Sequence, residues 1–401
     1  MTFRIFYLTL AFFTFSHLFA QVDSTQNAPV NMALSIVNNK DGHPLTVGIY
    51  AEIDFNQPIG NGTKQNGSLD VHRLVNFLGY RFNDKTHFVS EIEFEHVSEV
   101  YVEQAFLNYA VRPSLSLRAG LMLIPMGIIN EYHEPTTFNG VERPNMDKNI
   151  IPTTWREVGM GIFGRIDDAS IRYQAYVVNG FLSFNGEGTL RGSDGLRRGR
   201  QKGAESIMSN PNLSAKMDFY GVRGLKMGLA GYIGRTQSVL YDEMESANED
   251  GMAQADSSTV GVAMTGLDMR YRNRGFMARG QVIYSRLKGT QAYNAFTDSD
   301  LGSEMMGYYV ELGYDVLSLS VRDMGEKQVI LFSRFERYDT HHKVEGDALD
   351  NPAYHRTDIT SGISFKVANG AVFKGDYQYF LNASRPGRGN GQLNLGVGVW
   401  F

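Results

Sequence analysis

"AVFKGDYQYFL" at residues 371–381 alternates between apolar and polar side chains at every second position. The apolar face carries Phe373, Tyr377, Tyr379 and Leu381, and the polar face carries Lys374, Asp376 and Gln378. Because successive side chains of a β-strand point to opposite faces, this stretch predicts a strand with one apolar and one charged face. The same period recurs in "SLSLRAGLMLI" (114–124), "DITSGISFKV" (358–367) and "LNLGVGVWF" (393–401). An all-β, antiparallel fold is therefore expected.

Short and long connections alternate between the predicted strands. Tight turns are expected at 83–84, 112–113, 167–168, 221–224, 273–275 and 369–370. Longer polar segments fall near 56–66, 125–155, 182–208, 238–258, 288–303, 341–355 and 383–390. An up-and-down transmembrane β-barrel of the outer membrane has this arrangement, with short periplasmic turns and long external loops. Counting the segments between these connections gives about 16 strands. Residues 317–328 have no clear pattern, so about 14 or about 18 strands are alternatives. An even number of strands places both termini in the periplasm.

A soluble β-sandwich or propeller also buries alternating faces, and the sequence leaves this alternative open. Charges on the polar face favour the membrane barrel, because a packed core would reject them. These charges are Glu52, Asp54, Glu91, Glu93, Glu95, Arg118, Arg172, Asp268, Arg270 and Arg279. Aromatic residues near strand ends suggest interfacial girdles. They are Tyr80, Phe82, Tyr109, Phe181, Tyr271, Tyr338 and Phe380.

The N-terminus has the features of a secretory signal. Arg4 precedes a mostly apolar stretch that ends at Ala20 and is too short and interrupted for a spanning helix. We therefore expect a signal peptide (1–20), a short periplasmic lead-in (21–44) and an outer-membrane barrel (45–401). The chain has no cysteine, which excludes disulfides and thiolate metal sites. Its 43 acidic residues exceed its 38 basic ones, which argues against a nucleic-acid partner.

The stretch "LRAGLMLIPMGIINEYHEPTTFNGVERPNMDKNIIPTTWREVGMGIFG" (117–164) resembles the phosphate-selective porin O/P family of Gram-negative outer-membrane proteins. The elements that match are Arg118, Gly120, Pro125, Gly127, Pro135, Phe138, 141–144, Ile151, Pro152, Trp155, Glu157, Gly159, Gly161 and Gly164. The resemblance implies a trimeric diffusion channel whose third external loop, residues 125–155, folds into the lumen. The terminal Trp400 and Phe401 resemble the insertion signal that the barrel-assembly machinery reads.

Physical arguments also make residues 125–155 a plausible constriction loop. A barrel of about 16 strands encloses an aqueous lumen, and prolines would stiffen a loop that hangs into it. The expected pore-lining residues are Arg118, Glu131, His133, Glu134, Glu142, Arg143, Arg172, Asp268, Arg270 and Arg279. The signs are mixed and no ladder of one charge is visible, which suits small polar solutes and leaves selectivity for phosphate open.

Enzymatic chemistry, a resident metal and a cofactor are not expected. The pair His133 and Glu134 lacks the second histidine of a zinc-protease helix, and Pro135 disfavours a helix there. Both residues are better interpreted as loop lining, or simply as solvated loop charges. The segment 339–342 is the nearest approach to an acid–histidine site, and no serine–histidine–acid motif accompanies it.

Two predicted loops carry a strong charge bias. "RGSDGLRRGRQK" (191–202) is a basic external loop that could steer anions to the pore or simply be solvated. Its cations are Arg191, Arg197, Arg198, Arg200 and Lys202. "YDEMESANEDGMAQAD" (241–256) is acidic and could hold divalent cations beside lipopolysaccharide, although it lacks the spacing of a calcium loop.

The sequence thus favours a porin for passive diffusion of small hydrophilic solutes or ions, including anions such as phosphate. Its expected partners are outer-membrane lipid, lipopolysaccharide, the barrel-assembly machinery and copies of itself in a homotrimer. The alternative is a non-conducting subunit of a larger outer-membrane complex, with the lumen closed by residues 125–155.

Overall fold

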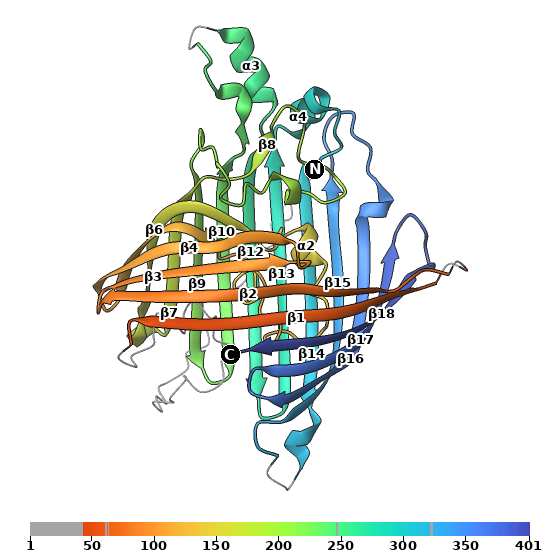
Figure 1. Cartoon of the computed structure of the whole chain (residues 1–401). Helices are drawn as coiled ribbons and strands as arrows, with labels where there is room; N and C mark the ends of the chain where they lie inside the picture. Colours follow the sequence, from red (N-terminus) through yellow and green to blue (C-terminus); the bar gives the residue numbers. More distant parts are fainter. Residues whose placement is uncertain (1–42, 61, 63, 246–247, 321–323) are drawn as a thin grey trace, which may run out of the picture.

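The computed structural model describes residues 43–60, 62, 64–245, 248–320 and 324–401. The predicted signal peptide (1–20) and nearly all of the lead-in (21–44) lie outside these residues. Within the described part of the chain, sixteen strands close into one antiparallel barrel (Figure 1). No helix in this part is long and apolar enough to cross a membrane.

The barrel strands follow the chain in order. They are β1 (Leu45–Ile59), β2 (Ser68–Asn83), β3 (Thr86–Glu95), β4 (Glu99–Arg112), β5 (Leu115–Leu123), β6 (Arg156–Ile166), β7 (Ile171–Val178), β9 (Asn212–Val222), β10 (Leu225–Arg235), β12 (Gly261–Asn273), β13 (Phe276–Lys288), β14 (Glu304–Asp315), β15 (Gln328–Lys343), β16 (His355–Ala368), β17 (Ala371–Asn382) and β18 (Asn390–Trp400). Outside the barrel, β8 (Leu182–Phe184) and β11 (Gln237–Ser238) form a small sheet.

The first and last strands close the barrel. Ala51 of β1 lies opposite Leu74 of β2 on one side and opposite Val399 of β18 on the other. The Ile49 N–H donates to the Phe401 carbonyl at 2.8 Å, so the end of the chain is part of the wall. The predicted up-and-down barrel is therefore confirmed, and the count is sixteen.

The two ends of the barrel differ in their connections. Tight turns such as 84–85, 274–275 and 369–370 lie at one end, and we call it the short-turn end. Most of the long connections lie at the other, the long-loop end, and carry α3 (Glu249–Ser257) and α4 (Thr290–Thr297), as Figure 1 shows, whereas the connection from β14 to β15 that begins with Val316–Leu319 lies at the short-turn end. The third connection at the long-loop end contains α2 (Met146–Asn149) and is the predicted constriction loop (125–155).

The outward face of the wall is apolar and exposed. On β9, Leu213 and Met217 are 55% and 45% exposed, whereas Lys216 and Asp218 on the inward face are 2% and 1% exposed. Exposed apolar side chains and buried polar side chains alternate in the same way on other strands of the barrel. A water-soluble protein does not present such a continuous apolar surface, whereas a transmembrane barrel turns this face to lipid.

Some aromatic residues predicted for the girdles lie elsewhere. Tyr80, Phe82 and Tyr109 are exposed near the short-turn end, as expected. Phe181 and Tyr338 are 1% and 4% exposed and lie in the interior, which corrects the prediction. Tyr338 points inward because of the pairing register of β15, and Phe181 packs against Trp155 at the end of the constriction loop. Neither position can be predicted from the pattern of a single strand.

Candidate functional site

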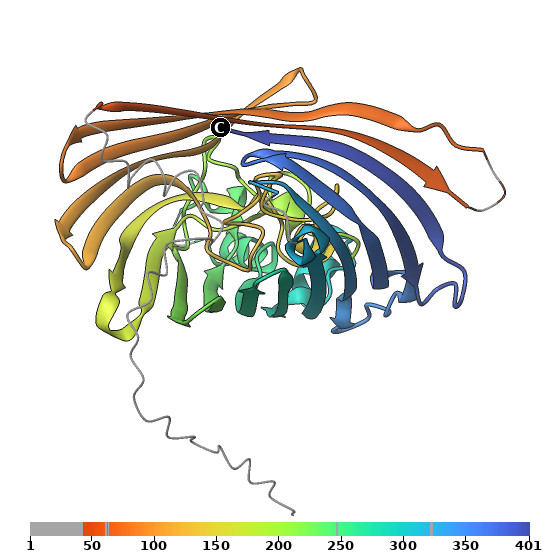
Figure 2. The same ribbon diagram turned by 90° about the horizontal axis from the view of Figure 1, so that it is seen from below.

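The constriction loop (125–155) crosses the interior of the barrel. It leaves the wall after β5 and returns at β6, and loop segments occupy the middle of the barrel seen from below (Figure 2). The Val141 N–H donates to Asp376 of β17 at 2.6 Å. The Asn145 amide donates to Asp358 of β16 at 2.8 Å. The loop is therefore fastened to the wall opposite its origin.

The constriction loop has an apolar core of its own. Its most deeply buried apolar residues are Met126, Ile128, Ile129, Met146, Ile150, Ile151 and Trp155. The Trp155 ring packs against Phe181 and Tyr232, with ring centroids 4.7 Å away in both cases. The Trp155 indole N–H donates to Glu157 at 2.9 Å, so this buried ring also satisfies its polar group. These contacts give the loop a defined shape inside the lumen.

Replacing Gly127 by Ala is expected to destabilise the base of the loop. Gly127 has a φ of +69°, and a Cβ there would lie 2.5 Å from Ile151 and 2.8 Å from Gln281. Strain of this kind costs about 1–3 kcal/mol, so the thermal unfolding midpoint should fall. Gly231→Ala is the matched control, because its Cβ would meet no atom closer than 4.0 Å. Equal midpoints for the two variants would contradict the placement of the loop.

His133 fastens the loop to the wall near its origin. Its Nε2 lies 3.2 Å from the Glu103 carboxylate and 3.5 Å from the Glu91 carboxylate. A β-bulge on β4 makes this possible, because Gln104 pairs with Glu91, Val102 pairs with the next residue of β3, and Glu103 is left over. Glu103 and Gln104 are both buried as a result. Strict alternation would place Glu103 on the lipid face, which is why the sequence did not reveal it.

The charge of His133 predicts a pH-dependent attachment. Although burial lowers the pKa of the His133 imidazole, Glu103 and Glu91 raise it from 6.5 to about 10. This contribution to stability is complete below pH 6.5 and declines to nothing as the pH rises through about 10. We expect the unfolding midpoint of the wild type to fall more between about pH 7 and 10.5 than that of His133→Asn. Parallel pH profiles would contradict this attachment.

The other predicted acidic and basic residues of the loop make separate contacts. Glu134 is buried, and its backbone carbonyl accepts the Thr137 N–H at 2.9 Å. Glu142 accepts a hydrogen bond from Asn56 of β1 at 2.6 Å. The Arg143 guanidinium donates to the His133 carbonyl at 3.3 Å.

Lys216 of β9 is the centre of a buried ionic network that was not predicted from the sequence. Its Nζ lies 2.9 Å from Glu131 of the loop and 3.0 Å from Asp268 of β12. It also donates to the Gly127 carbonyl at 2.7 Å. Arg172 extends the network, 3.5 Å from Glu131 and 2.7 Å from Asp218. The alternation of residues 212–222 was the available signal, because it places Lys216 on the charged face.

A row of cations lies on the short-turn side of the loop. Lys226 of β10 lies directly opposite Arg270 of β12, and Arg270 lies directly opposite Arg279 of β13. Like charges in such positions destabilise a sheet. We call Lys226, Arg270 and Arg279 the basic row. It could not be predicted from the sequence, because only the pairing register of the three strands aligns these residues.

Tyr132 of the loop rests on the basic row. Its hydroxyl accepts a hydrogen bond from Lys226 at 3.0 Å, and the Arg270 guanidinium lies 4.3 Å from the ring centre. Burial raises the pKa of the Tyr132 phenol, but Arg172, Lys226 and Arg270 outweigh burial and lower it to about 8.

Arg118 and Arg279 occupy different places in the wall. The Arg118 guanidinium lies 4.2 Å from the Phe106 ring centre and donates to Asn108 at 2.9 Å. Arg279 donates to the Thr137 carbonyl of the loop at 3.2 Å and pairs with Glu311 at 2.9 Å.

The basic segment 191–202 does not behave as a solvated external loop. Leu190 and Leu196 are 0% and 1% exposed. Arg197 donates to the Thr153 carbonyl at 2.7 Å, and Arg200 donates to the Pro152 and Thr154 carbonyls at 3.1 Å. This corrects the expectation, because the segment folds back to hold the end of the constriction loop. Its remaining cations are Arg191, which is exposed, Arg198, which pairs with Asp194, and Lys202, which lies over Tyr101.

The segment 339–342 also holds loops together. Both ring nitrogens of His341 contact backbone groups, with Nε2 near the Asp300 carbonyl and Nδ1 accepting from the Asn351 N–H. The Thr340 hydroxyl donates to the Gly192 carbonyl.

At the other end of the barrel, the Trp400 N–H donates to the Gly370 carbonyl at 2.6 Å, and the Phe401 ring is exposed.

Two groups of side chains have the composition and spacing of metal ligands among the described residues. One is Glu91, Glu103 and His133, and the other is Asp54, Asp70 and His72. Both lie at β-bulges of the first four strands. The sequence did not suggest either group, because the pairing register and the bulges bring their side chains to one place.

Comparisons with known proteins agree with this architecture. No protein-family model matches the chain. An uncharacterized protein of Aquifex aeolicus (strain VF5) is 32% identical over 348 residues, which span 83% of this chain and 75% of that protein. Three solved outer-membrane proteins share the fold, at 10–12% identity.

The first of these structures is the channel DcaP of Acinetobacter baumannii, with a TM-score of 0.56 over 89% of this chain and 97% of that chain. An anion-selective porin from Comamonas acidovorans has a TM-score of 0.55 over 89% of this chain and 100% of that chain. A loop-deletion mutant of OmpT from Vibrio cholerae has a TM-score of 0.54 over 90% of this chain and 100% of that chain. At such low identity, the likeness establishes the barrel fold and nothing finer.

Proposed function

We propose that this chain, which belongs to the same family as the uncharacterized Aquifex aeolicus protein, is a porin of a Gram-negative outer membrane. It would admit small hydrophilic solutes by passive diffusion, without covalent chemistry. The observation that carries the proposal is a closed sixteen-stranded barrel with an apolar exterior and a charged lumen narrowed by a folded loop. In this orientation the short turns, Phe401 and the beginning of β1 face the periplasm.

Anions are the solutes that the lumen favours in this proposal. The basic row sets Lys226, Arg270 and Arg279 side by side in the wall, and acidic residues offset their repulsion at two of the three positions, with Asp218 3.9 Å from Lys226 and Glu311 2.9 Å from Arg279. Basic side chains at a constriction select anions, and the forked guanidinium binds carboxylate and phosphate well. The resemblance of residues 117–164 to phosphate-selective porins points the same way, with phosphate as one candidate solute.

A second candidate function rests on the extent of burial inside the barrel. Inward-facing charges at the level of the loop, such as Glu91, Lys216, Asp218 and Arg334, are no more than 2% exposed. A lumen filled this tightly would suit a non-conducting subunit of a larger outer-membrane assembly.

Conductance in a planar bilayer separates the two functions. The porin proposal expects steady conductance steps from the purified chain, and a reversal potential under a salt gradient with the sign of anion preference. Silence from a heat-modifiable, correctly folded barrel would favour the assembly subunit. Steps with cation preference would retain the pore and remove the role given to the basic row.

A further inference from the structure

We propose that Asp54, Asp70, His72 and His96 form a binding site for a divalent first-row transition-metal ion of the zinc type. The site would lie at the long-loop end of β1, β2 and β3. It is independent of the proposed transport function, because it depends only on the folded barrel.

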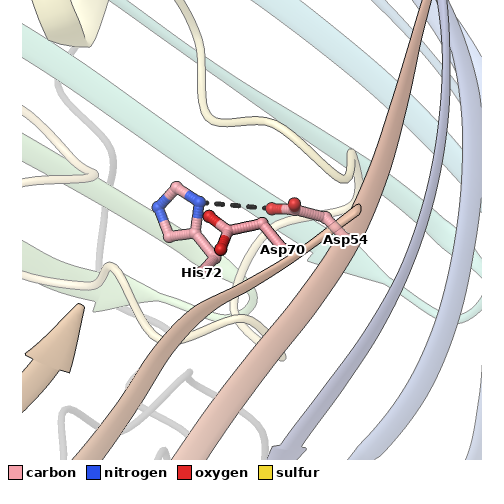
Figure 3. Close-up of side chains that lie close together, drawn as sticks. All are labelled: Asp54, Asp70 and His72. Atoms are coloured by element: carbon pink, nitrogen blue, oxygen red, sulfur yellow. Dashed lines mark ion pairs between the residues drawn. The ribbon is translucent and has the colours of Figure 1, made fainter. Parts of the chain in front are cut away.

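The first argument is the arrangement of the side chains. Ligand atoms of Asp54, Asp70 and His72 all lie within 4.8 Å of one another, and Figure 3 shows the three side chains pointing toward one another from β1 and β2. The His72 Nδ1 lies 3.2 Å from the Asp54 carboxylate. Ligands around one zinc ion at about 2.0–2.2 Å lie about 3–4 Å apart, so small side-chain rotations would complete the site.

His96 supplies the fourth ligand. It follows β3 directly, its Nδ1 contacts the Asp70 carboxylate, and its ring centre lies 5.6 Å from that of His72. Its other nitrogen, Nε2, lies 4.0 Å from Glu95. A carboxylate that accepts a hydrogen bond from the far nitrogen commonly orients a metal-binding imidazole, and Glu95, at an ion-pair distance, would have to move closer to do so.

The backbone register brings the two carboxylates together at an electrostatic cost. Asp54 lies directly opposite Asp70 in the β1–β2 ladder, where like charges are unfavourable. A register shift just before this pair leaves Val71 and His72 opposite one residue of β1, and thus turns His72 toward the aspartates. Among the described residues, no lysine or arginine pairs with either aspartate, and their ion-pair partners are His72 and His96.

The chemistry of the donors selects the ion. Two imidazole nitrogens and two carboxylate oxygens suit zinc and its first-row neighbours, whereas calcium and magnesium prefer oxygen ligands alone. The site is also accessible, since the side chains of Asp70, His72 and His96 are 27%, 28% and 48% exposed.

The other group of potential ligands is already satisfied by protein contacts. Glu91 accepts hydrogen bonds from Tyr50 and Gln104, and Glu103 accepts one from Thr154. Arg156 lies 3.6 Å from Glu103, so a metal ion there would meet a neighbouring cation. We therefore assign that group to attachment of the loop.

The test uses the untagged full chain in detergent micelles, titrated with Co²⁺ and Cu²⁺ as spectroscopic substitutes for zinc. We expect one ion per chain, Cu²⁺ magnetic-resonance spectra with coupling to two nitrogens, and competition by Zn²⁺. His72→Asn and His96→Asn should each lower the affinity by at least about tenfold. Two matched controls, His87→Asn in β3 and His133→Asn in the loop, should bind as the wild type does.

Three outcomes would overturn the proposal. They are the absence of stoichiometric binding, binding that survives both His72→Asn and His96→Asn, and loss of binding in His133→Asn with the first two unaffected. Heat-modifiable migration on gels verifies that each variant is folded. Because His96 is half exposed and follows the end of β3, His96→Asn provides the test even where His72→Asn fails to fold.

Discussion

A chain carrying both Lys226→Glu and Arg270→Glu is expected to reverse its ion preference from anions to cations. The two substitutions change the charge of the basic row by four units, directly beside Tyr132 of the constriction loop. A unit charge at about 4 Å interacts with a passing ion by roughly 1 kcal/mol even in water. Since about 1.4 kcal/mol corresponds to a factor of ten, the permeability ratio should change by about tenfold or more. The reversal potential under a salt gradient measures this directly.

The control for this variant carries the same charge change outside the row. Lys85→Glu with Arg165→Glu alters two exposed residues near the short-turn end and should leave the preference for anions intact. Lys226→Gln with Arg270→Gln provides a milder version in which preference is lost rather than reversed. An unchanged reversal potential in a folded Glu variant would mean that ions do not pass the basic row.

Lys216→Met is expected to release the base of the constriction loop. The substitution leaves Glu131, Asp218 and Asp268 without the ammonium that lies among them. Removing one partner from a buried ionic network costs about 3–5 kcal/mol. Arg172 still pairs with Glu131 and Asp218 in this variant, but Asp268 stays buried after losing its contact with the ammonium. We expect a large fall in the unfolding midpoint, together with larger or noisier conductance steps as the loop departs from its position.

Lys85→Met is the matched control, because Lys85 is exposed in a tight turn. This variant should have the unfolding midpoint and the conductance of the wild type. If Lys216→Met proved as stable as this control, the ionic network would not hold the loop. If it were less stable but conducted with unchanged steps, the network would support the barrel wall without fixing the lumen.

The wall of the barrel was predictable because each strand carries its own signal. In residues 371–381 the apolar positions Phe373 and Tyr377 are exposed, and the polar positions Lys374, Asp376 and Gln378 are buried, as alternation requires. In "VHRLVNFLGYRF" (71–82), by contrast, apolar side chains occur on both faces of the strand. Val75 and Phe77 point into the barrel, where Phe77 packs beside Tyr50.

The long inward loop was predictable in position but not in its contacts. Its length, prolines and resemblance to a porin loop placed residues 125–155 in the lumen, and the hydrogen bonds of Val141 and Asn145 to the far wall agree with that prediction. The packing of residues 191–202 against this loop was not predicted, because the carbonyls that Arg197 and Arg200 bind are brought to them only when the constriction loop is folded.

The sequence alone determined the all-β class, the alternation of short and long connections and the charged character of the inner face. These properties are local, since they depend on the period of side chains within one strand and on the residues between strands. The pairing register and the bulges decided the rest. They aligned Lys226 with Arg270 and Arg279, turned Glu103 inward toward His133, and set Asp54 opposite Asp70. A shift of one residue in register moves every side chain to the other face, so only the closed barrel fixes which charges meet.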